Sequence, residues 1–226
     1  MNRIYQPYKK ILFDLDGTLT DSGPGIKNSI SYALNKYGIK ANHEELTAMI
    51  GPPLQYSFQN IFGFSGKKAT QAVEYYREYF RNKGIFDNQL YPGITEMLKQ
   101  LNENNCQLYI ATSKPTVFAK QILQHFKIEQ FFQLVIGSNL DGSRVTKSEI
   151  IGTVKELAGG LNRDETVMVG DREHDIIGAQ AHNLYTIGVA YGYGSLEELK
   201  TVQPTAIAGS VAELSILLSE GINSTT

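Results

Sequence analysis

Residues 11–19 read ILFDLDGTL, in which three apolar residues run into Asp14, a leucine and Asp16 before the chain reaches a glycine. A short run that is apolar on consecutive positions predicts a strand covered on both faces. Residues i and i+2 of an extended chain point to the same side. Both carboxylates are therefore expected to face one small space, where their repulsion calls for a proton or a cation.

Similar apolar runs recur along the chain and alternate with segments of helical periodicity. Strands are predicted at 10–14, 107–112, 133–137, 166–170 and 184–189, and helices at 93–104, 115–125, 147–159, 173–182 and 211–219. This alternation predicts an α/β fold, a doubly wound parallel sheet with helices on both faces. Ligands bind outside the carboxyl ends of such strands, which is where Asp14 and Asp16 lie.

Residues 21–88 break the alternation, because helical patterns follow one another there without a convincing strand. The segment 67–84 carries an apolar stripe and ends in a glycine, a natural helix stop. GPPL at 51–54 must interrupt the helices, since proline breaks a helix and restricts the residue before it. We therefore predict an all-helical domain at 21–88, inserted into a core made of 1–20 and 89–226.

Further polar side chains follow other predicted strands. ATSKP brings Thr112 and Ser113 to the end of the second strand, Lys147 begins a helix, and GDREHD brings Asp171 and Asp175 to the end of the fourth. Hydroxyls and an ammonium suit an oxyanion. Each group also has an ordinary structural explanation, as a helix cap, a solvated lysine or a helix-start acid. Their coincidence at several strand ends favours a shared site.

These residues resemble the four motifs of the haloacid dehalogenase-like hydrolase superfamily. The motifs are FDLDGTLTD, ATSKP, Lys147 and GDREHD, and the resemblance covers almost the whole chain. It implies a Rossmann-like core, and the helical insert resembles that superfamily's cap domain. MIGPPLQYSF and YREYFRNKGIFDNQLYPGI resemble more closely the phosphoglycolate phosphatase-like members.

The resemblance implies a phosphatase that hydrolyses small phosphate monoesters with Mg²⁺. Asp14 would attack phosphorus to form an aspartyl-phosphate, and Asp16 would protonate the leaving oxygen and then activate water. Mg²⁺ would be held by Asp14, the backbone carbonyl of Asp16 and Asp171, with Asp175 orienting these ligands. The phosphoryl oxygens would be held by Thr112, Ser113 and Lys147.

Alternatives to this activity remain open. The dehalogenases lack an aspartate at the place of Asp16, because no leaving alkoxide needs a proton, so phosphoryl chemistry is favoured. Within it, 5′-nucleotidase, pyrophosphatase and sugar phosphomutase activities use the same motifs. A phospho-acceptor signalling module would be shorter and would lack the insert.

Other motifs are weaker or excluded. A calcium-binding loop that began at Asp14 would need Gly at its sixth position and Glu at its twelfth, but this chain has Leu19 and Gly25 there. GFSGKK at 63–68 lacks the P-loop spacing. AYGYGS at 190–195 lacks the third glycine of a dinucleotide site and is expected to border the active site. Arg172 is a candidate to reach an anionic substrate.

The composition limits the classes of binding partner that we expect for this protein. The 226 residues carry a net charge of -2 and one cysteine. There is no basic excess to suggest nucleic acid, and no apolar stretch approaches the ~18 residues of a membrane span. MNRIYQPYKK has no apolar segment of the secretory kind. The prediction is a cytoplasmic monomer or homodimer that binds a small phosphorylated metabolite.

Overall fold

The computed structural model describes residues 8–220. The first seven residues of the MNRIYQPYKK stretch therefore lie outside the described residues. The chain divides into two compact units. The first, here called the core, comprises Met1–Thr20 and Leu90–Thr226, and the second, here called the insert, is Asp21–Gln89. Across the described residues, the structure holds no helix with the length and apolar character needed to span a bilayer.

The core is built on six parallel strands in the order β5-β4-β1-β6-β7-β8. The strands are β1 (Lys10–Phe13), β4 (Gln107–Pro115), β5 (Phe132–Ser138), β6 (Thr166–Gly170), β7 (Tyr185–Val189) and β8 (Ala206–Ala208). The predicted doubly wound α/β architecture is confirmed, together with the five predicted strands. Strand β8, which has three residues, is not among the predicted strands.

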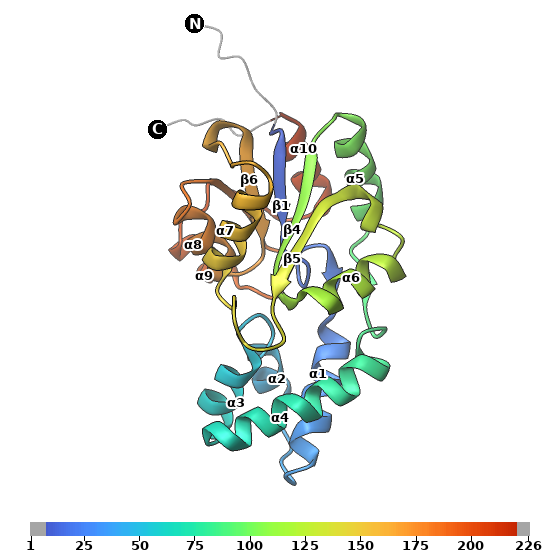
Figure 1. Ribbon diagram of the computed structural model, residues 1–226, viewed down its shortest axis with the longest axis vertical. Coiled ribbons are helices and arrows are strands. Elements are labelled where there is room, and N and C mark those ends of the chain that lie inside the picture. The colour runs from blue at the N-terminus through green and yellow to red at the C-terminus, as the bar shows by residue number, and fades with distance from the viewer. Residues whose placement is uncertain (1–7, 221–226) are drawn as a thin grey trace, which may run out of the picture. The chain divides into compact units, whose positions relative to one another are not determined.

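Helices cover both faces of this sheet, which explains the consecutive apolar residues in its strands. Helices α7 and α8 lie on one side, and α5, α6 and α10 on the other (Figure 1). Ile11, Leu12 and Phe13 of β1 are each fully buried between these layers. The helices are α5 (Ile94–Glu103), α6 (Thr116–His125), α7 (Lys147–Leu157), α8 (Glu173–Gln180), α9 (Leu196–Thr201) and α10 (Val211–Glu220). Short 3₁₀ turns precede β5 at Glu129–Phe131 and β6 at Arg163–Glu165.

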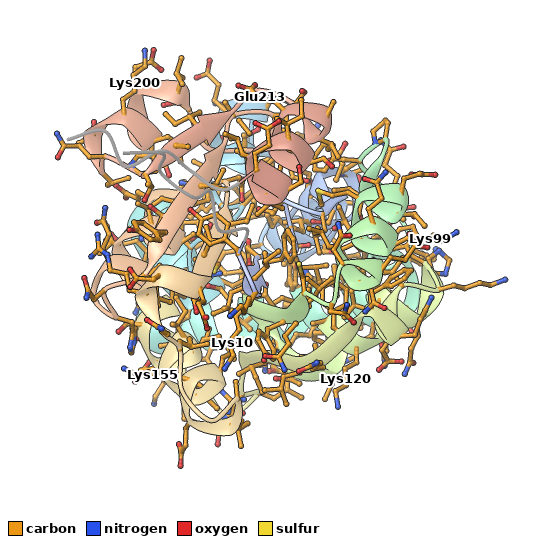
Figure 2. All side chains as sticks on the ribbon, turned by 90° about the horizontal axis from the view of Figure 1, so that it is seen from above. Lys10, Lys99, Lys120, Lys155, Lys200 and Glu213 are labelled. Carbon is orange, nitrogen blue, oxygen red and sulfur yellow. The ribbon has the colours of Figure 1, made fainter. Side chains whose placement is uncertain are left out.

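The outer faces of the core helices are charged, as an amphipathic helix on a sheet requires. Figure 2 shows Lys99, Lys120, Lys155 and Lys200 extending outward from four different helices, and all four are exposed. Lys10 differs, because it is half-buried and donates to the carbonyls of Ala158 and Gly160 just beyond α7. Its ammonium thereby satisfies backbone acceptors left open near a helix end.

The insert consists mainly of helices. It contains α1 (Gly23–Asn35), α2 (His43–Ala48), α3 (Leu54–Phe62), α4 (Gly66–Tyr79) and a π-turn at Phe80–Gly84. GPPL separates α2 from α3, as predicted, and Pro53 stands immediately before α3. Two short strands, β2 (Thr20–Asp21) and β3 (Gln89–Leu90), pair where the chain leaves and re-enters the core.

Candidate active site

Asp14 lies at the carboxyl end of β1, the central position between β4 and β6. Its backbone N–H donates to the Val169 carbonyl at 2.9 Å, so the ladder with β6 holds the residue although the strand ends at Phe13. The chain then turns sharply at Gly17, whose φ of 84° strongly favours glycine. The side chain of Asp14 is nearly buried.

Lys147 begins α7 and is the centre of the charged cluster. Its ammonium lies 2.8 Å from Asp14 Oδ1 and 2.6 Å from Asp175 Oδ1, and it donates to the Ala111 carbonyl at 2.8 Å. These three contacts use the three donors of the ammonium. Burial by itself lowers the pKa of Lys147, but the two carboxylates outweigh burial and the pKa is raised. Lys147 is therefore a permanent cation.

Asp171 and Asp175 approach the same point from β6 and α8. Oxygens of Asp14, Asp171 and Asp175 lie within 4.8 Å of one another, and all three residues are buried. Burial raises the pKa of Asp171 well above its usual range, and neighbouring Asp175 and Asp14 raise it further. Burial also raises the pKa of Asp175 to about 6, although Lys147 opposes the shift.

The three carboxylates fit a metal ion. Two charges at this separation repel by about 3–4 kcal/mol at an effective dielectric constant of ~20, and Lys147 offsets only part of that repulsion. Burial is the main cause of the raised pKa values of Asp171 and Asp175, and the neighbouring carboxylates add to it. An all-oxygen, carboxylate-rich set of ligands is what a hard divalent cation prefers. The cluster could therefore hold a metal ion, and the carboxylate of Asp175 belongs to it.

Asp16 faces Lys114, a partner that the sequence analysis does not assign to it. The ammonium of Lys114 lies 2.8 Å from Asp16 Oδ2, and both side chains are largely buried. Thr112 and Lys114 are two residues apart on β4, the same spacing in sequence as that of Asp14 and Asp16. Residues i and i+2 of a strand point to the same side, so the sequence is enough to predict that Lys114 lies on the same side as Thr112. The neighbouring position of β4 and β1 then brings lysine and acid together.

Thr112 and Ser113 lie in the last part of β4, which continues to Pro115, three residues beyond the predicted end. The Thr112 hydroxyl is buried and accepts from the backbone N–H of Lys114 at 3.3 Å. The Ser113 carbonyl accepts from the Ser138 hydroxyl at 2.8 Å, which fixes the end of β4 against β5. The structure thus brings the carboxylates of Asp14, Asp171 and Asp175 close together, and Lys147 bridges Asp14 and Asp175. Thr112 and Ser113 lie on β4, the strand next to β1.

Arg172, the candidate to reach an anionic substrate, pairs with an acid of the core. Its guanidinium Nε lies 2.8 Å from Glu198 Oε1 of α9, and the same oxygen accepts from the Glu173 backbone at 2.9 Å. The arginine is engaged within the core as a brace for the start of α8. Its neighbour His174 is exposed on that helix. Helix α9, which is not among the predicted helices, supplies Glu198.

The arrangement can support chemistry on a phosphoryl group. The buried carboxylate of Asp14, a second acid two residues away and two lysines gather at the carboxyl edge of one sheet. Fixed cations of this kind stabilise negative charge on transferring oxygens. The buried carboxylates add a place for a divalent cation, which can polarise a phosphoryl oxygen.

Comparisons with known proteins agree with this geometry. The haloacid dehalogenase-like hydrolase family model matches residues 11–189. A 5′-nucleotidase of Pseudomonas aeruginosa is 43% identical, over 92% of this chain and 94% of its own. A phosphoglycolate phosphatase of Yersinia pestis is 30% identical over 93% of each chain.

Two further proteins, one found by sequence and one by structure, also match most of this chain. The tyrosine-protein kinase PtkA of Mycobacterium tuberculosis is 37% identical over 90% of this chain and 70% of its own. The crystal structure of a predicted phosphatase from Clostridium acetobutylicum superposes with a TM-score of 0.89 at 47% identity, covering 93% of this chain and 98% of that one. The chain therefore belongs to the haloacid dehalogenase-like hydrolase family and is a phosphatase of its phosphoglycolate phosphatase-like group.

Proposed function

We propose that the protein is a Mg²⁺-dependent phosphatase that hydrolyses small phosphate monoesters through an aspartyl-phosphate on Asp14. The observation that carries this proposal is the buried cluster of Asp14, Asp171 and Asp175 around Lys147 at the carboxyl edge of the sheet. Asp16, held by Lys114, supplies the second acid that ester hydrolysis needs. The phosphatases among the relatives support the same reaction.

In the first step, a carboxylate oxygen of Asp14 attacks phosphorus and the bond to the ester oxygen breaks. Asp16 gives its proton to the leaving oxygen, which departs as an alcohol. In the second step Asp16 takes a proton from water, whose oxygen attacks phosphorus and releases phosphate. Asp14 is thereby regenerated as a carboxylate. Lys147 keeps its contacts with Asp14, Asp175 and the Ala111 carbonyl throughout, and its positive charge offsets the negative charge that develops on the phosphoryl oxygens.

Asp14, Asp171 and the backbone carbonyl of Asp16 would hold the Mg²⁺, with Asp175 beside them. The ion supplies charge neutralisation for a dianionic substrate and for the acids that surround it. Asp175 is itself fixed by Lys147 and by the backbone N–H of Arg172 at 3.1 Å. Thr112 and Ser113 would contribute donors to the phosphoryl oxygens from the end of β4.

A second candidate is 5′-nucleotidase activity, which the 43% identity to a 5′-nucleotidase favours. A panel of 2-phosphoglycolate, 5′-nucleotides, pyrophosphate and sugar phosphates, assayed for phosphate release, ranks the candidates. An isomerised sugar phosphate in place of free phosphate would identify a mutase and contradict the hydrolase. No phosphate release from any compound of the panel would contradict the proposed function as a whole.

Removal of the metal is expected to abolish activity. EDTA should stop phosphate release and added Mg²⁺ should restore it. Asp171→Asn keeps the shape that the tight packing around this side chain needs, but it removes the ligand charge. Because removing a residue that only orients a metal ligand costs ~10–100-fold in affinity, loss of the ligand itself should raise the half-activating Mg²⁺ concentration at least ~100-fold. Phosphate release across a Mg²⁺ titration measures the change.

The matched control is Asp164→Asn, since Asp164 is exposed at the opposite end of β6 from Asp171. It should leave the Mg²⁺ titration unchanged. Full activity of the wild type in metal-free buffer, or of Asp171→Asn at wild-type Mg²⁺ concentrations, would contradict a catalytic metal.

The insert is proposed to act as a cap that selects the organic part of the substrate. The chain enters it directly after the turn that follows Asp16 and returns at Leu90. Replacing Pro52 and Pro53 together by alanine loosens the turn between α2 and α3, since proline restricts the backbone. We expect the kcat/KM ratio between preferred and poor substrates to fall about tenfold. Hydrolysis of p-nitrophenyl phosphate should change less.

The control for this experiment is Pro204→Ala, a single proline-to-alanine change in a core loop. Its substrate ranking should match that of the wild type. If the Pro52/Pro53 variant also kept the wild-type ranking, the turn would only join two helices, and selection would lie in loops of the core.

A further inference from the structure

The loop formed by residues 191–195, which follows β7, contacts the carboxyl edge of the sheet at Asp171. The backbone N–H of Tyr193 donates to Asp171 Oδ2 at 2.8 Å. The Thr18 hydroxyl lies 3.4 Å from the other oxygen, Oδ1. The carboxylate of Asp171 is thus held between a loop that follows β7 and the turn that follows β1.

The approach of this loop to Asp171 is so close that only glycine fits. A Cβ added at Gly192 would lie 2.4 Å from Asp171 Cβ and 2.3 Å from the carbonyl oxygen of Gly17. A Cβ at Gly194 would lie 1.9 Å from the carbonyl oxygen of Asp171. One at Gly17 would lie 2.2 Å from Asp171 Oδ2. The loop, the turn and the acid therefore form one packed unit.

Tyr191 joins the loop to the turn by a side-chain contact. Its hydroxyl donates to the Thr18 carbonyl at 3.0 Å. Its ring packs edge-on against Tyr91, with centroids 4.9 Å apart and planes inclined by 67°. The backbone N–H of Tyr91 in turn donates to the Leu19 carbonyl at 3.1 Å. Burial raises the pKa of Tyr191, so the hydroxyl keeps its proton and remains a donor.

We infer that Tyr191 is a positioning residue for the metal ligand Asp171, acting through its hydrogen bond to Thr18 and the glycine contacts of the loop. The inference rests on the proposed function, because it assigns Asp171 to the metal. The hydroxyl sets the distance between the turn after β1 and the loop after β7. That distance fixes where Tyr193 and Thr18 meet the two oxygens of Asp171. If the loop were loosened, the Asp171 carboxylate would still be present but would be less well oriented toward the metal.

Tyr191→Phe tests the inference, because it removes the hydroxyl and keeps the ring against Tyr91. We expect Mg²⁺ binding to the resting enzyme, measured by calorimetry, to weaken about tenfold. At saturating Mg²⁺ we expect kcat to fall several-fold while the KM for ester changes less than about twofold, since the loop orients a metal ligand and not the organic group. Thermal unfolding without metal should stay close to that of the wild type.

The matched control is Tyr109→Phe, which removes a tyrosine hydroxyl from β4 that bonds to two glutamine side chains, Gln107 and Gln133. It should leave both Mg²⁺ affinity and kcat unchanged. Wild-type Mg²⁺ affinity in Tyr191→Phe, or an equal loss in both variants, would overturn the inference. Failure of the proposed function is a separate result, because the wild type itself would then release no phosphate or need no metal.

Discussion

Replacing Asp14 by Asn is expected to abolish phosphate release and to leave the core folded. The amide has the shape of the carboxylate but cannot attack phosphorus. Loss of a covalent nucleophile should reduce kcat by at least about 10⁴-fold. Lys147 retains Asp175 and the Ala111 carbonyl as acceptors, so its ammonium keeps partners. One of three mutually repelling carboxylates is removed, and the melting temperature should be equal or higher.

Two measurements check this result. Phosphate release gives the loss of turnover, and the intact mass of acid-quenched enzyme after mixing with substrate reports a covalent phosphoryl group. The wild type should show the added phosphoryl mass and Asp14→Asn should not. Asp141→Asn, in an exposed loop of the core, should behave as the wild type. Turnover by Asp14→Asn at a rate near that of the wild type would contradict the mechanism.

The second large effect is expected from Lys147→Met, which removes the ammonium that bridges Asp14 and Asp175. Methionine fills a similar volume, but it leaves buried carboxylates without their cation. Removing one partner from a buried ion pair typically costs about 3–5 kcal/mol. The melting temperature should fall by about 10 °C for a chain of this size. Activity should also fall, by about 10³-fold, because the negative charge on the phosphoryl oxygens loses a fixed positive charge nearby.

Thermal unfolding with and without Mg²⁺ separates the two roles of Lys147. Because a divalent cation neutralises the same acids, Mg²⁺ should recover part of the lost stability but not the activity. Lys155→Met, at an exposed position of the same helix, should change neither. A melting temperature for Lys147→Met that matches the wild type in the absence of metal would contradict the electrostatic account of the cluster.

Local sequence is enough to predict the elements that are long or wholly buried. The apolar runs 11–13 of β1 and 167–169 of β6 are covered on both faces, so each residue of these runs is apolar. Strand β8 and helix α9 escape prediction because they are short: three residues of small and medium size, and a single amphipathic segment of six. The two-residue strands β2 and β3 exist only through their pairing with each other, which no local pattern encodes.

By itself, the sequence determined the types of groups at the site and the side of the sheet on which they emerge. Asp14 and Asp16 follow an apolar run, and alternation along an extended chain puts both carboxylates on one side. Asp171 and Lys147 follow other elements of the same alternating pattern. Since parallel strands end at the same edge, the alternating pattern alone is enough to predict that these groups approach one another.

Only the tertiary structure decided which group meets which. Because β4 lies next to β1, Lys114 forms an ion pair with Asp16. The position of the start of α7 brings Lys147 between Asp14 and Asp175. The close packing of glycines around Asp171 likewise joins segments that are far apart in the chain. Hydrogen bonds and ion pairs form over about 3 Å. Such distances depend on the order and register of the strands, which are set by packing of the whole core and not by any local segment.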